Sequence, residues 1–340
     1  MVRLIPLPLF HVAVAPMTHI SALKDGIQTY IMRRLDLMQF LGYLPKYHVT
    51  DLGIVPPIAV AIINSPTSHD IFFKGIKSAI CGAAPLEKSL QAVLRRQLPP
   101  NVPFTQVWGM TEVSGLGFMT PYPEDDETGS VGRLIPGMEA KFVLLITLVT
   151  TFTKFYARLI DDDGKDISAY NVRGEICLRG PIVIGGYFEN DAANRESFDQ
   201  DGWFKTGDIG YCAKGTEKWY IVDRKKELIK VRGFQVAPPE IEAVLVSHPY
   251  IVDAAVIGVT LPSSDSEHPR AYVVKSTVPN AVALSESDVK IFVASRLAKY
   301  KTLSGGVEFV DAIPKNASGK ILKKTLRERA RRETGRKAQL

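Results

Sequence analysis

The pattern of hydrophobic and polar positions in the first hundred residues predicts strands that alternate with helices. A helical pattern over Leu35–Tyr47 leads into the apolar run Val49–Val55, and Pro56-Pro57 closes that run. We interpret this as a helix, a buried strand and a helix begun by proline. A second unit has the same order, with a strand over Ile76–Cys81, a turn at Gly82–Pro85, a helix over Glu87–Leu98 and a strand over Phe104–Trp108. Such alternation predicts an α/β fold with a largely parallel sheet layer.

Beyond about Gly129 the pattern changes to short β-type runs between glycines, which predicts a smaller β-rich subdomain ending near Tyr220–Val222. After Asp223 it becomes mixed, with a helix expected over Pro239–His248 and strands over Ala254–Val259 and Ala271–Lys275. We therefore place a boundary at Asp223. The expected domains are a large domain (1–222), a small α+β C-terminal domain (223–332) and a basic tail (333–340).

The run Phe142–Arg158 interrupts this organisation. It is β-prone and almost uncharged, and its flanks, Gly137–Lys141 and Leu159–Gly164, would read continuously without it. Runs of this kind aggregate when they are exposed. We expect residues 142–158 to be a non-native insert, translated from an unremoved intron.

Charge and composition exclude several classes of protein. The net charge is +6, but residues 315–340 carry ten Lys/Arg against Glu328 and Glu333, so the rest of the chain sums to −2. Because this basic end has no recognition motif, we expect no nucleic-acid partner. No apolar run is long enough to span a bilayer, and the start is too short and too broken by prolines to be a signal peptide. The three cysteines, Cys81, Cys177 and Cys212, fit neither a disulfide framework nor a zinc site.

Two short motifs carry groups that suit a nucleotide. The run WGMTE, 108–112, follows a predicted strand, where the carboxyl ends of parallel strands face a ligand crevice. Its ring can stack on a base, its threonine can bond a phosphate and its glutamate can hold Mg²⁺. The run WFKTGD, 203–208, places a carboxylate after a glycine turn, suited to ribose hydroxyls. Each motif taken alone also fits an ordinary turn.

Two further motifs lie in the small domain. The run 223–235, DRKKELIKVRGFQ, is dense in charge, and the run 314–320, PKNASGK, presents a lysine on a Ser-Gly turn before a helix. A lysine on such a loop can reach phosphate oxygens as a mobile point charge. Solvated charges at a strand edge remain the alternative for the lysines of the first run.

The order and spacing of these motifs resemble the adenylate-forming superfamily. The resemblance rests on the runs 82–85, 108–112, 206–208, 223–235 and 318–320. The stretch from Asp223 through GFQVAPPE is most similar to the 4-coumarate–CoA ligase and acyl-CoA synthetase branch. The resemblance to the superfamily covers the whole chain apart from 142–158. It implies a truncated large domain, with its parallel sheet layer and β-rich subdomain, followed by a small α+β domain.

The resemblance implies a two-step reaction. A small carboxylic acid attacks the α-phosphate of ATP to give an acyl-adenylate and pyrophosphate, and coenzyme A then displaces AMP after the C-terminal domain has turned. ATP and AMP, Mg²⁺ and coenzyme A are the implied ligands, and no obligate protein partner is evident. The segments expected around the acid are small or apolar, so we expect an aromatic or medium-chain acid.

The resemblance also implies roles for single residues. Thr111 would bind phosphate and Glu112 would hold Mg²⁺. Trp108 stands where the family more often has tyrosine, and stacking on adenine should survive that change. Asp208 and Arg224 would hold the ribose hydroxyls. The full set expected to bind the nucleotide or cofactor is Ala83, Ala84, Trp108, Gly109, Thr111, Asp208, Arg224 and Gly233.

The implied catalytic residues are Lys320, His11, Lys230 and Gln235. Lys320 would bridge the carboxylate and α-phosphate oxygens in the first transition state. His11 matches an aromatic–histidine turn that closes over the carboxylate in relatives. Lys226 is the expected hinge. Lys230 and Gln235 would contact the acyl-adenylate in the second step, while Gly233 would leave room for the pantetheine arm.

The family's phosphate loop, expected upstream of His11, does not occur in this sequence, so we expect a truncated chain whose sheet has an exposed edge. A catalytically silent remnant that binds adenylate or a protein partner is the first alternative to a ligase. An adenylating domain that loads a carrier protein is the second. The final Ala338-Gln339-Leu340 loosely resembles a peroxisomal signal, so the expected location is cytoplasmic or peroxisomal.

Overall fold

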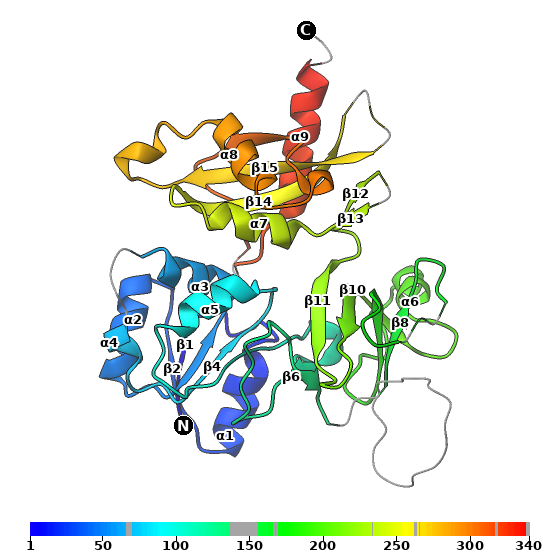
Figure 1. The fold of residues 1–340 in the computed structure, drawn as a ribbon. Coiled ribbons are helices and arrows are strands. Elements are labelled where there is room, and N and C mark those ends of the chain that lie inside the picture. The colour runs from blue at the N-terminus through cyan, green and yellow to red at the C-terminus, as the bar shows by residue number, and fades with distance from the viewer. Residues whose placement is uncertain are drawn as a thin grey trace. The chain divides into compact units, whose positions relative to one another are not determined.

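The computed structural model describes residues 1–65, 70–136, 156–165, 167, 169–232, 234–261, 264, 266–316 and 319–337. The chain divides into two compact units, Met1–Val222 and Asp223–Leu340 (Figure 1).

A five-stranded parallel sheet forms the base of the first unit. Its order is β2-β1-β3-β4-β5, and each neighbouring pair is parallel. Parallel pairs need crossover connections, which the intervening helices supply. The strands are β1 (Val2–Ile5), β2 (Gln28–Ile31), β3 (Asp51–Ile54), β4 (Ser78–Cys81) and β5 (Phe104–Gln106).

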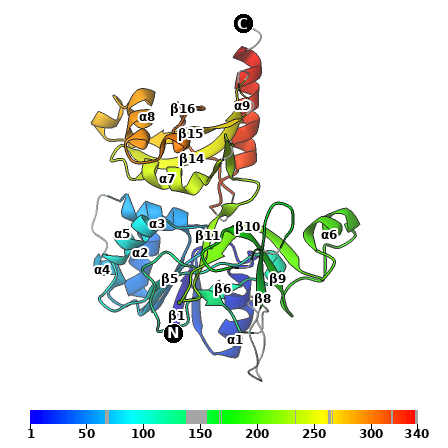
Figure 2. The ribbon, with the colours of Figure 1, turned by 45° about the vertical axis from the view of Figure 1, so that its right-hand side comes forward.

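Helices cover this sheet and bury one hydrophobic core with it. In Figures 1 and 2, α2 and α4 lie on one side of β1 and β2, and α1 lies on the other. Asp36 caps α2 by accepting from the Gln39 amide at 2.9 Å. Phe40, Leu41 and Leu44 then pack into the core. The helices are a π-helix (Pro16–Ser21), α1 (Ala22–Lys24), α2 (Leu37–Lys46), α3 (Pro56–Ile63), α4 (Asp70–Phe73) and α5 (Lys88–Arg95).

A β-rich subdomain completes the first unit, as the sequence predicted. Its four-stranded sheet has the order β11-β10-β9-β8 (Figure 2), and β9 pairs antiparallel with β8 and β10. The elements are a 3-10 helix (Thr111–Val113), β6 (Phe118–Met119), β7 (Arg133–Leu134), β8 (Tyr156–Ile160), β9 (Gly174–Arg179), α6 (Asp191–Ser197), β10 (Phe204–Cys212) and β11 (Trp219–Arg224).

The expected insert lies mostly outside the described residues, which omit 137–155. Its last three residues, 156–158, belong to the backbone of β8, which pairs with β9.

All three cysteines are buried and free. Burial raises the pKa of the Cys212 thiol to about 12. The Cys212 thiol therefore stays protonated and acts as a small hydrophobic side chain.

The second unit is a small α+β domain. Its three-stranded sheet has the order β14-β15-β16, with β14 and β15 antiparallel and β15 and β16 parallel, and β12 and β13 form a separate hairpin. The elements are β12 (Ile229–Val231), β13 (Phe234–Val236), α7 (Pro238–Val246), β14 (Ile251–Thr260), β15 (Glu267–Lys275), a 3-10 helix (Pro279–Ala281), α8 (Glu286–Ala294), a 3-10 helix (Lys299–Lys301), β16 (Gly306–Phe309) and α9 (Lys323–Lys337).

Helix α9 continues to Lys337, so the first five residues of the expected basic tail are helical. The last three residues of the chain, 338–340, are outside the described residues. Within the part of the chain that the structure describes, we find no helix that is both long enough and apolar enough to cross a membrane.

Candidate functional site

The turn after β4 exposes two alanines, and the first of them adopts a conformation that is rare for alanine. Ala83 has a φ of +70°, in the left-handed region, and both Ala83 and Ala84 are exposed. Such a conformation costs free energy and marks positions where the surrounding structure fixes the backbone. Gly82 lets the turn approach β5 closely, because a Cβ there would lie 2.7 Å from Val107 Cγ2.

A buried glutamine holds this turn in place. Gln106 accepts a hydrogen bond from the Leu86 amide at 3.0 Å and donates one to the Leu86 carbonyl at 2.8 Å. It also donates to Gln91 Oε1 at 3.0 Å, and Gln91 donates to the Asp126 carbonyl at 2.6 Å. Neither glutamine was predicted from the sequence as part of the site. The available signal was the polar side chain of Gln106 within a mostly apolar stretch of sequence.

Trp108 connects the end of β5 to the β-rich subdomain. Its indole N–H donates to Asp208 Oδ2 at 2.8 Å. The ring packs edge-on against Phe118, with centroids 5.2 Å apart, and the side chain is buried. The structure thus brings together two predicted site residues that are 100 positions apart in the sequence.

An irregular step in β10 presents Asp208. The pairing of β10 with β9 shifts register between Lys205 and Ile209, and Gly207 has a φ of +71° at that step. Thr206 Oγ1 accepts from the Asp208 amide at 3.1 Å and donates to the Ile176 carbonyl at 2.8 Å. Asp208 is therefore held through its backbone as well as through its side chain.

The loop after Trp108 places a hydroxyl and a carboxylate side by side in sequence. Gly109 is required there, because a Cβ would lie 1.6 Å from the Gly115 carbonyl oxygen. Thr111 is exposed. Glu112 Oε1 accepts from the Tyr187 hydroxyl at 3.0 Å. Burial and this bond to Glu112 raise the pKa of the Tyr187 phenol, so it remains a donor that orients the carboxylate.

The donor set around Glu112 fits Mg²⁺ held partly by a nucleotide. Magnesium is typically bound by one or two carboxylates together with substrate phosphates, rather than by a cage of protein ligands. Glu112 offers one carboxylate beside an exposed threonine hydroxyl, which matches that pattern. Tyr187 was not identified from the sequence, because it lies 75 positions away from Glu112.

His11 lies in a compact turn of the first unit. Its amide donates to the Pro8 carbonyl at 3.1 Å, and its Nδ1 accepts from the Ala13 amide at 3.1 Å, which leaves the proton on Nε2. The same turn approaches the loop of Thr111, since a Cβ on Gly115 would lie 3.3 Å from the Val12 carbonyl oxygen. His11 is therefore on the segment that borders this loop.

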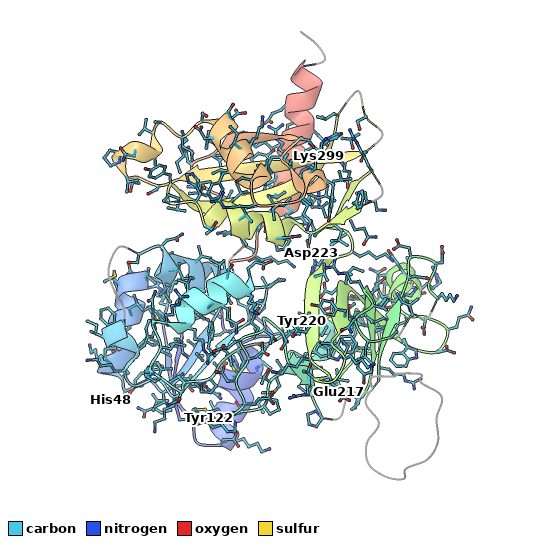
Figure 3. All side chains as sticks on the ribbon, viewed as in Figure 1. His48, Tyr122, Glu217, Tyr220, Asp223 and Lys299 are labelled. Atoms are coloured by element: carbon cyan, nitrogen blue, oxygen red, sulfur yellow. The ribbon has the colours of Figure 1, made fainter. Side chains whose placement is uncertain are left out.

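Asp223, on β11, begins the second unit (Figure 3). It is buried, its Oδ1 accepts from the Arg224 amide at 2.7 Å, and its Oδ2 has no hydrogen-bond partner among the residues that the structure describes. Burial raises the pKa of this carboxyl to about 6, although Lys323 acts in the opposite direction.

Lys226, the expected hinge, is exposed, and its carbonyl accepts from Arg327 at 3.4 Å.

The β12–β13 hairpin carries the residues expected to act in the second step. Lys230 and Gln235 are direct partners across it, and both are exposed. The Lys230 amide donates to Glu267 Oε2 at 2.7 Å, which ties the hairpin to β15. Gly233, the expected neighbour of the pantetheine arm, is outside the described residues.

Lys320 is exposed at the end of a tight loop. Its amide donates to Asn316 Oδ1 at 2.9 Å and its carbonyl accepts from the Asn316 amide at 2.9 Å. Gly319 has a φ of +83°, which closes the loop. Residues 317 and 318 of the motif are outside the described residues.

Each unit thus carries its own part of the predicted site. In the first unit, packing and hydrogen bonds connect the turn of Ala83, the WGMTE loop, Asp208 and the turn of His11. The second unit carries the other predicted residues that the structure describes: Arg224, Lys226, Lys230, Gln235 and Lys320.

Comparison with known proteins gives matches over both units. Residues 2–188 match the family model described as AMP-binding enzyme, and residues 240–320 match the one described as AMP-binding enzyme C-terminal domain. A phenylacetyl-CoA ligase of Aspergillus niger, epaB, is 50% identical over 329 residues, which are 96% of this chain and 57% of the relative. A 4-coumarate–CoA ligase 2 of Solanum tuberosum is 37% identical over 327 residues, 95% of this chain and 56% of the relative.

A solved structure agrees with these matches. ATP-bound MatB from Rhodopseudomonas palustris aligns with a TM-score of 0.80 and 27% identity, over 98% of this chain and 61% of that chain. The present chain therefore spans somewhat more than half the length of the proteins that it matches.

Proposed function

The chain belongs to the family of AMP-binding enzymes, and from this premise we propose that it acts as an ATP-dependent acid–CoA ligase. In the first step, a carboxylate oxygen attacks the α-phosphorus of ATP and pyrophosphate leaves. In the second step, the sulfur of coenzyme A attacks the acyl carbon, the thiol proton is released and AMP leaves with the bonding electrons. The product is an acyl-CoA thioester.

The observation that supports this proposal most strongly is the hydrogen bond from Trp108 to Asp208. It joins the WGMTE loop, suited to a base and phosphates, to a buried carboxylate suited to ribose hydroxyls. A nucleoside monophosphate needs these three kinds of contact within one site.

In the first unit we assign the following roles. Ala83, Ala84, Trp108 and Gly109 line the adenine slot, and Asp208 accepts from the ribose hydroxyls. Thr111 donates to a phosphate oxygen. Glu112, oriented by Tyr187, holds Mg²⁺, which when bound would offset the repulsion between the anionic acid and ATP. His11 closes over the carboxylate of the acid.

In the second unit we assign Lys320 to the adenylation step. Its ammonium group is a compact charge on a loop tightened by Asn316 and Gly319, and would stabilise the negative charge on the transferring oxygens. Arg224 would hold the ribose and Lys226 would serve as the hinge. Lys230 and Gln235, paired across the hairpin, would contact the acyl-adenylate during the thioester step.

The proposed acid is aromatic or medium-chain. The segments near the expected acid site are small or apolar, and the relative that is 50% identical is named as a phenylacetyl-CoA ligase. Phenylacetate is therefore the first acid to test, followed by 4-coumarate and octanoate.

Acid-dependent exchange of labelled pyrophosphate into ATP tests the first step. We expect exchange with at least one of these acids and its loss, by a factor of about 100 or more, in Lys320→Ala, because one preorganised charge contributes that much to a transition state. Lys324→Ala is the matched control, since it removes an exposed lysine of the same unit outside the proposed site. It should leave the exchange unchanged.

Lys230→Ala separates the two steps. It should retain pyrophosphate exchange and lose acyl-CoA formation, measured by chromatography of the thioester. A folded chain that binds AMP but catalyses no exchange would contradict the ligase proposal and favour a silent adenylate-binding protein. Exchange that loads a carrier pantetheine in preference to coenzyme A would favour a carrier-loading domain.

We also propose a location for the protein, based on its last three residues. Ala338-Gln339-Leu340 would direct the protein to peroxisomes. A fluorescent protein fused upstream of the full chain should then co-localise with a peroxisomal marker, and deletion of the three residues should return it to the cytoplasm. Cytoplasmic fluorescence in both cases would contradict this proposal.

A further inference from the structure

Stacking on a base requires only an aromatic ring, but the indole of Trp108 is also fixed in orientation by its surroundings. The residue is 8% exposed. Its backbone exchanges hydrogen bonds with Phe118 at 3.0 Å in both directions. A Cβ on Gly117 would lie 2.6 Å from Cζ3 of the ring, so glycine at 117 makes room for the full indole. Backbone, ring and neighbour together fix the direction of the N–H.

That N–H meets a carboxylate that is itself almost buried. Asp208 is 5% exposed, and its Oδ2 accepts from the indole at 2.8 Å. A buried anion needs donors, and an indole N–H is a pure donor that cannot exchange roles with its partner. A bond to an ionised acceptor is also stronger than a neutral one. The indole therefore fixes which carboxylate oxygen faces the protein.

From this geometry we infer that Trp108 is a positioning residue for ribose recognition. Its N–H anchors Oδ2 of Asp208 and so fixes the orientation in which this carboxylate meets the ribose hydroxyls. The inference rests on the proposed function, in which Asp208 binds the ribose. It adds a polar role for Trp108 to the base-lining role, and a phenylalanine of similar shape could not perform it.

The decisive variant removes only the donor. Replacement of Trp108 by the benzothiophene analogue of tryptophan, in which sulfur takes the place of the N–H, keeps the shape of the ring. Calorimetry then measures binding of AMP and of 2′,3′-dideoxyadenosine monophosphate, which lacks both ribose hydroxyls. The same replacement at Trp203, a buried tryptophan of the first unit outside the proposed site, is the control.

We expect the analogue at position 108 to weaken AMP binding about tenfold, equivalent to 1.4 kcal/mol, and to leave binding of the dideoxy nucleotide within about twofold. Asp208→Asn should show the same selective loss. Equal weakening of both nucleotides would show that the ring acts only by packing and would overturn the inference. An unchanged affinity for AMP would overturn it as well.

The inference can fail separately from the proposed function. An unmodified chain that binds AMP no better than the dideoxy nucleotide would refute the ribose role of Asp208, and with it this inference. A preference for AMP that is present in the unmodified chain and retained in the analogue would refute the inference alone.

A second measurement needs no nucleotide. The indole N–H proton resonance of Trp108, assigned by its disappearance in the analogue, should lie downfield and move upfield in Asp208→Asn, because the charged acceptor is lost. A resonance that does not respond to Asp208→Asn would overturn the pairing itself.

Discussion

At the residue scale, Asp223 is the clearest case of a group that lowers the stability of its own fold. Burial raises the pKa of this carboxyl from 3.8 to about 6, against the opposing effect of Lys323, and Glu242 and Glu227 add to the rise. Its Oδ2 has no partner among the described residues. Above about pH 6 the folded chain therefore contains a buried anion, whereas the unfolded chain contains a hydrated one.

Asp223→Asn should consequently raise the free energy of unfolding at pH 8 by up to about 3 kcal/mol, since each unit of pKa shift corresponds to about 1.4 kcal/mol and the shift from 3.8 to about 6 already includes the attraction to Lys323. The sign follows from the raised pKa. As the pH falls from about 6 to 4, the folded carboxyl takes up a proton and its penalty disappears. The difference between variant and original chain should vanish there.

Urea unfolding between pH 4 and pH 8 measures this difference. Asp311→Asn, which replaces an exposed carboxylate of the same unit, is the control and should show no such trend. A difference for Asp223→Asn that is constant across the pH range, or a loss of stability at pH 8, would contradict the prediction.

At the scale of elements, the end of strand β5 and the residues that follow it position two parts of the first unit, through Gln106 and Trp108. Gln106 holds the turn after β4, and Trp108 holds Asp208 on β10. Residues two positions apart on an extended chain point to the same side. One short segment thereby connects the turn of Ala83 to Asp208.

Gln106→Met, which keeps the length of the side chain, should lower the free energy of unfolding by about 2–4 kcal/mol, because the Leu86 amide and carbonyl would lose buried partners that are worth roughly 1–3 kcal/mol each. The turn carrying Ala83 would also lose its anchor, so AMP should bind roughly tenfold more weakly, a change of about 1.4 kcal/mol. Denaturant unfolding and calorimetry measure the two effects.

Gln39→Met is the matched control, since Gln39 is an exposed residue of α2. It should change neither quantity appreciably. If Gln106→Met lowers stability and leaves AMP affinity intact, Gln106 stabilises the fold but does not position the turn for AMP binding.

At the scale of the whole molecule, each hydrophobic core belongs to one of the two units. Among the described residues, the clusters around Phe40, Phe118 and Trp203 contain residues before Val222, and those around Val256 and Tyr272 contain residues after Asp223. A unit that holds a complete core of its own can fold without its neighbour.

A chain of residues 223–340 should therefore fold alone. Circular dichroism should show a cooperative thermal transition, and its proton NMR spectrum should have dispersed methyl resonances. Val256→Asp, which places a charge at a fully buried position of that core, is the control and should abolish the transition. Broad, undispersed spectra with binding of a hydrophobic dye would contradict the prediction.

Much of the fold was predictable from the sequence, because local pattern and tertiary environment agree. The prolines that begin α3 and α7 and the runs that became β3, β4 and β5 each predicted an element that the structure contains, within a few residues. The α/β fold class and the family resemblance are likewise confirmed. The resemblance was carried by the ordered motifs.

The elements that the sequence analysis missed have weak local patterns. Strand β1, VRLI, is four residues long and is followed by prolines, yet it pairs with both β2 and β3. Strand β2, QTYI, has no alternation. Their strand conformation comes from ladder hydrogen bonds to neighbours distant in sequence, which a local window does not contain.

By itself, then, the sequence determined the alternation of strands with helices between α2 and β5, the place where the pattern changes at Asp223, and the residue types that suit a nucleotide and a transferring phosphate. Only the tertiary structure decided that Gln106 braces the turn of Ala83, that Tyr187 orients Glu112 and that the indole of Trp108 donates to Asp208. The physical reason is that sequence pattern reports burial and local conformation, whereas a hydrogen bond depends on direction. Direction is set when the chain brings side chains up to 100 positions apart into contact.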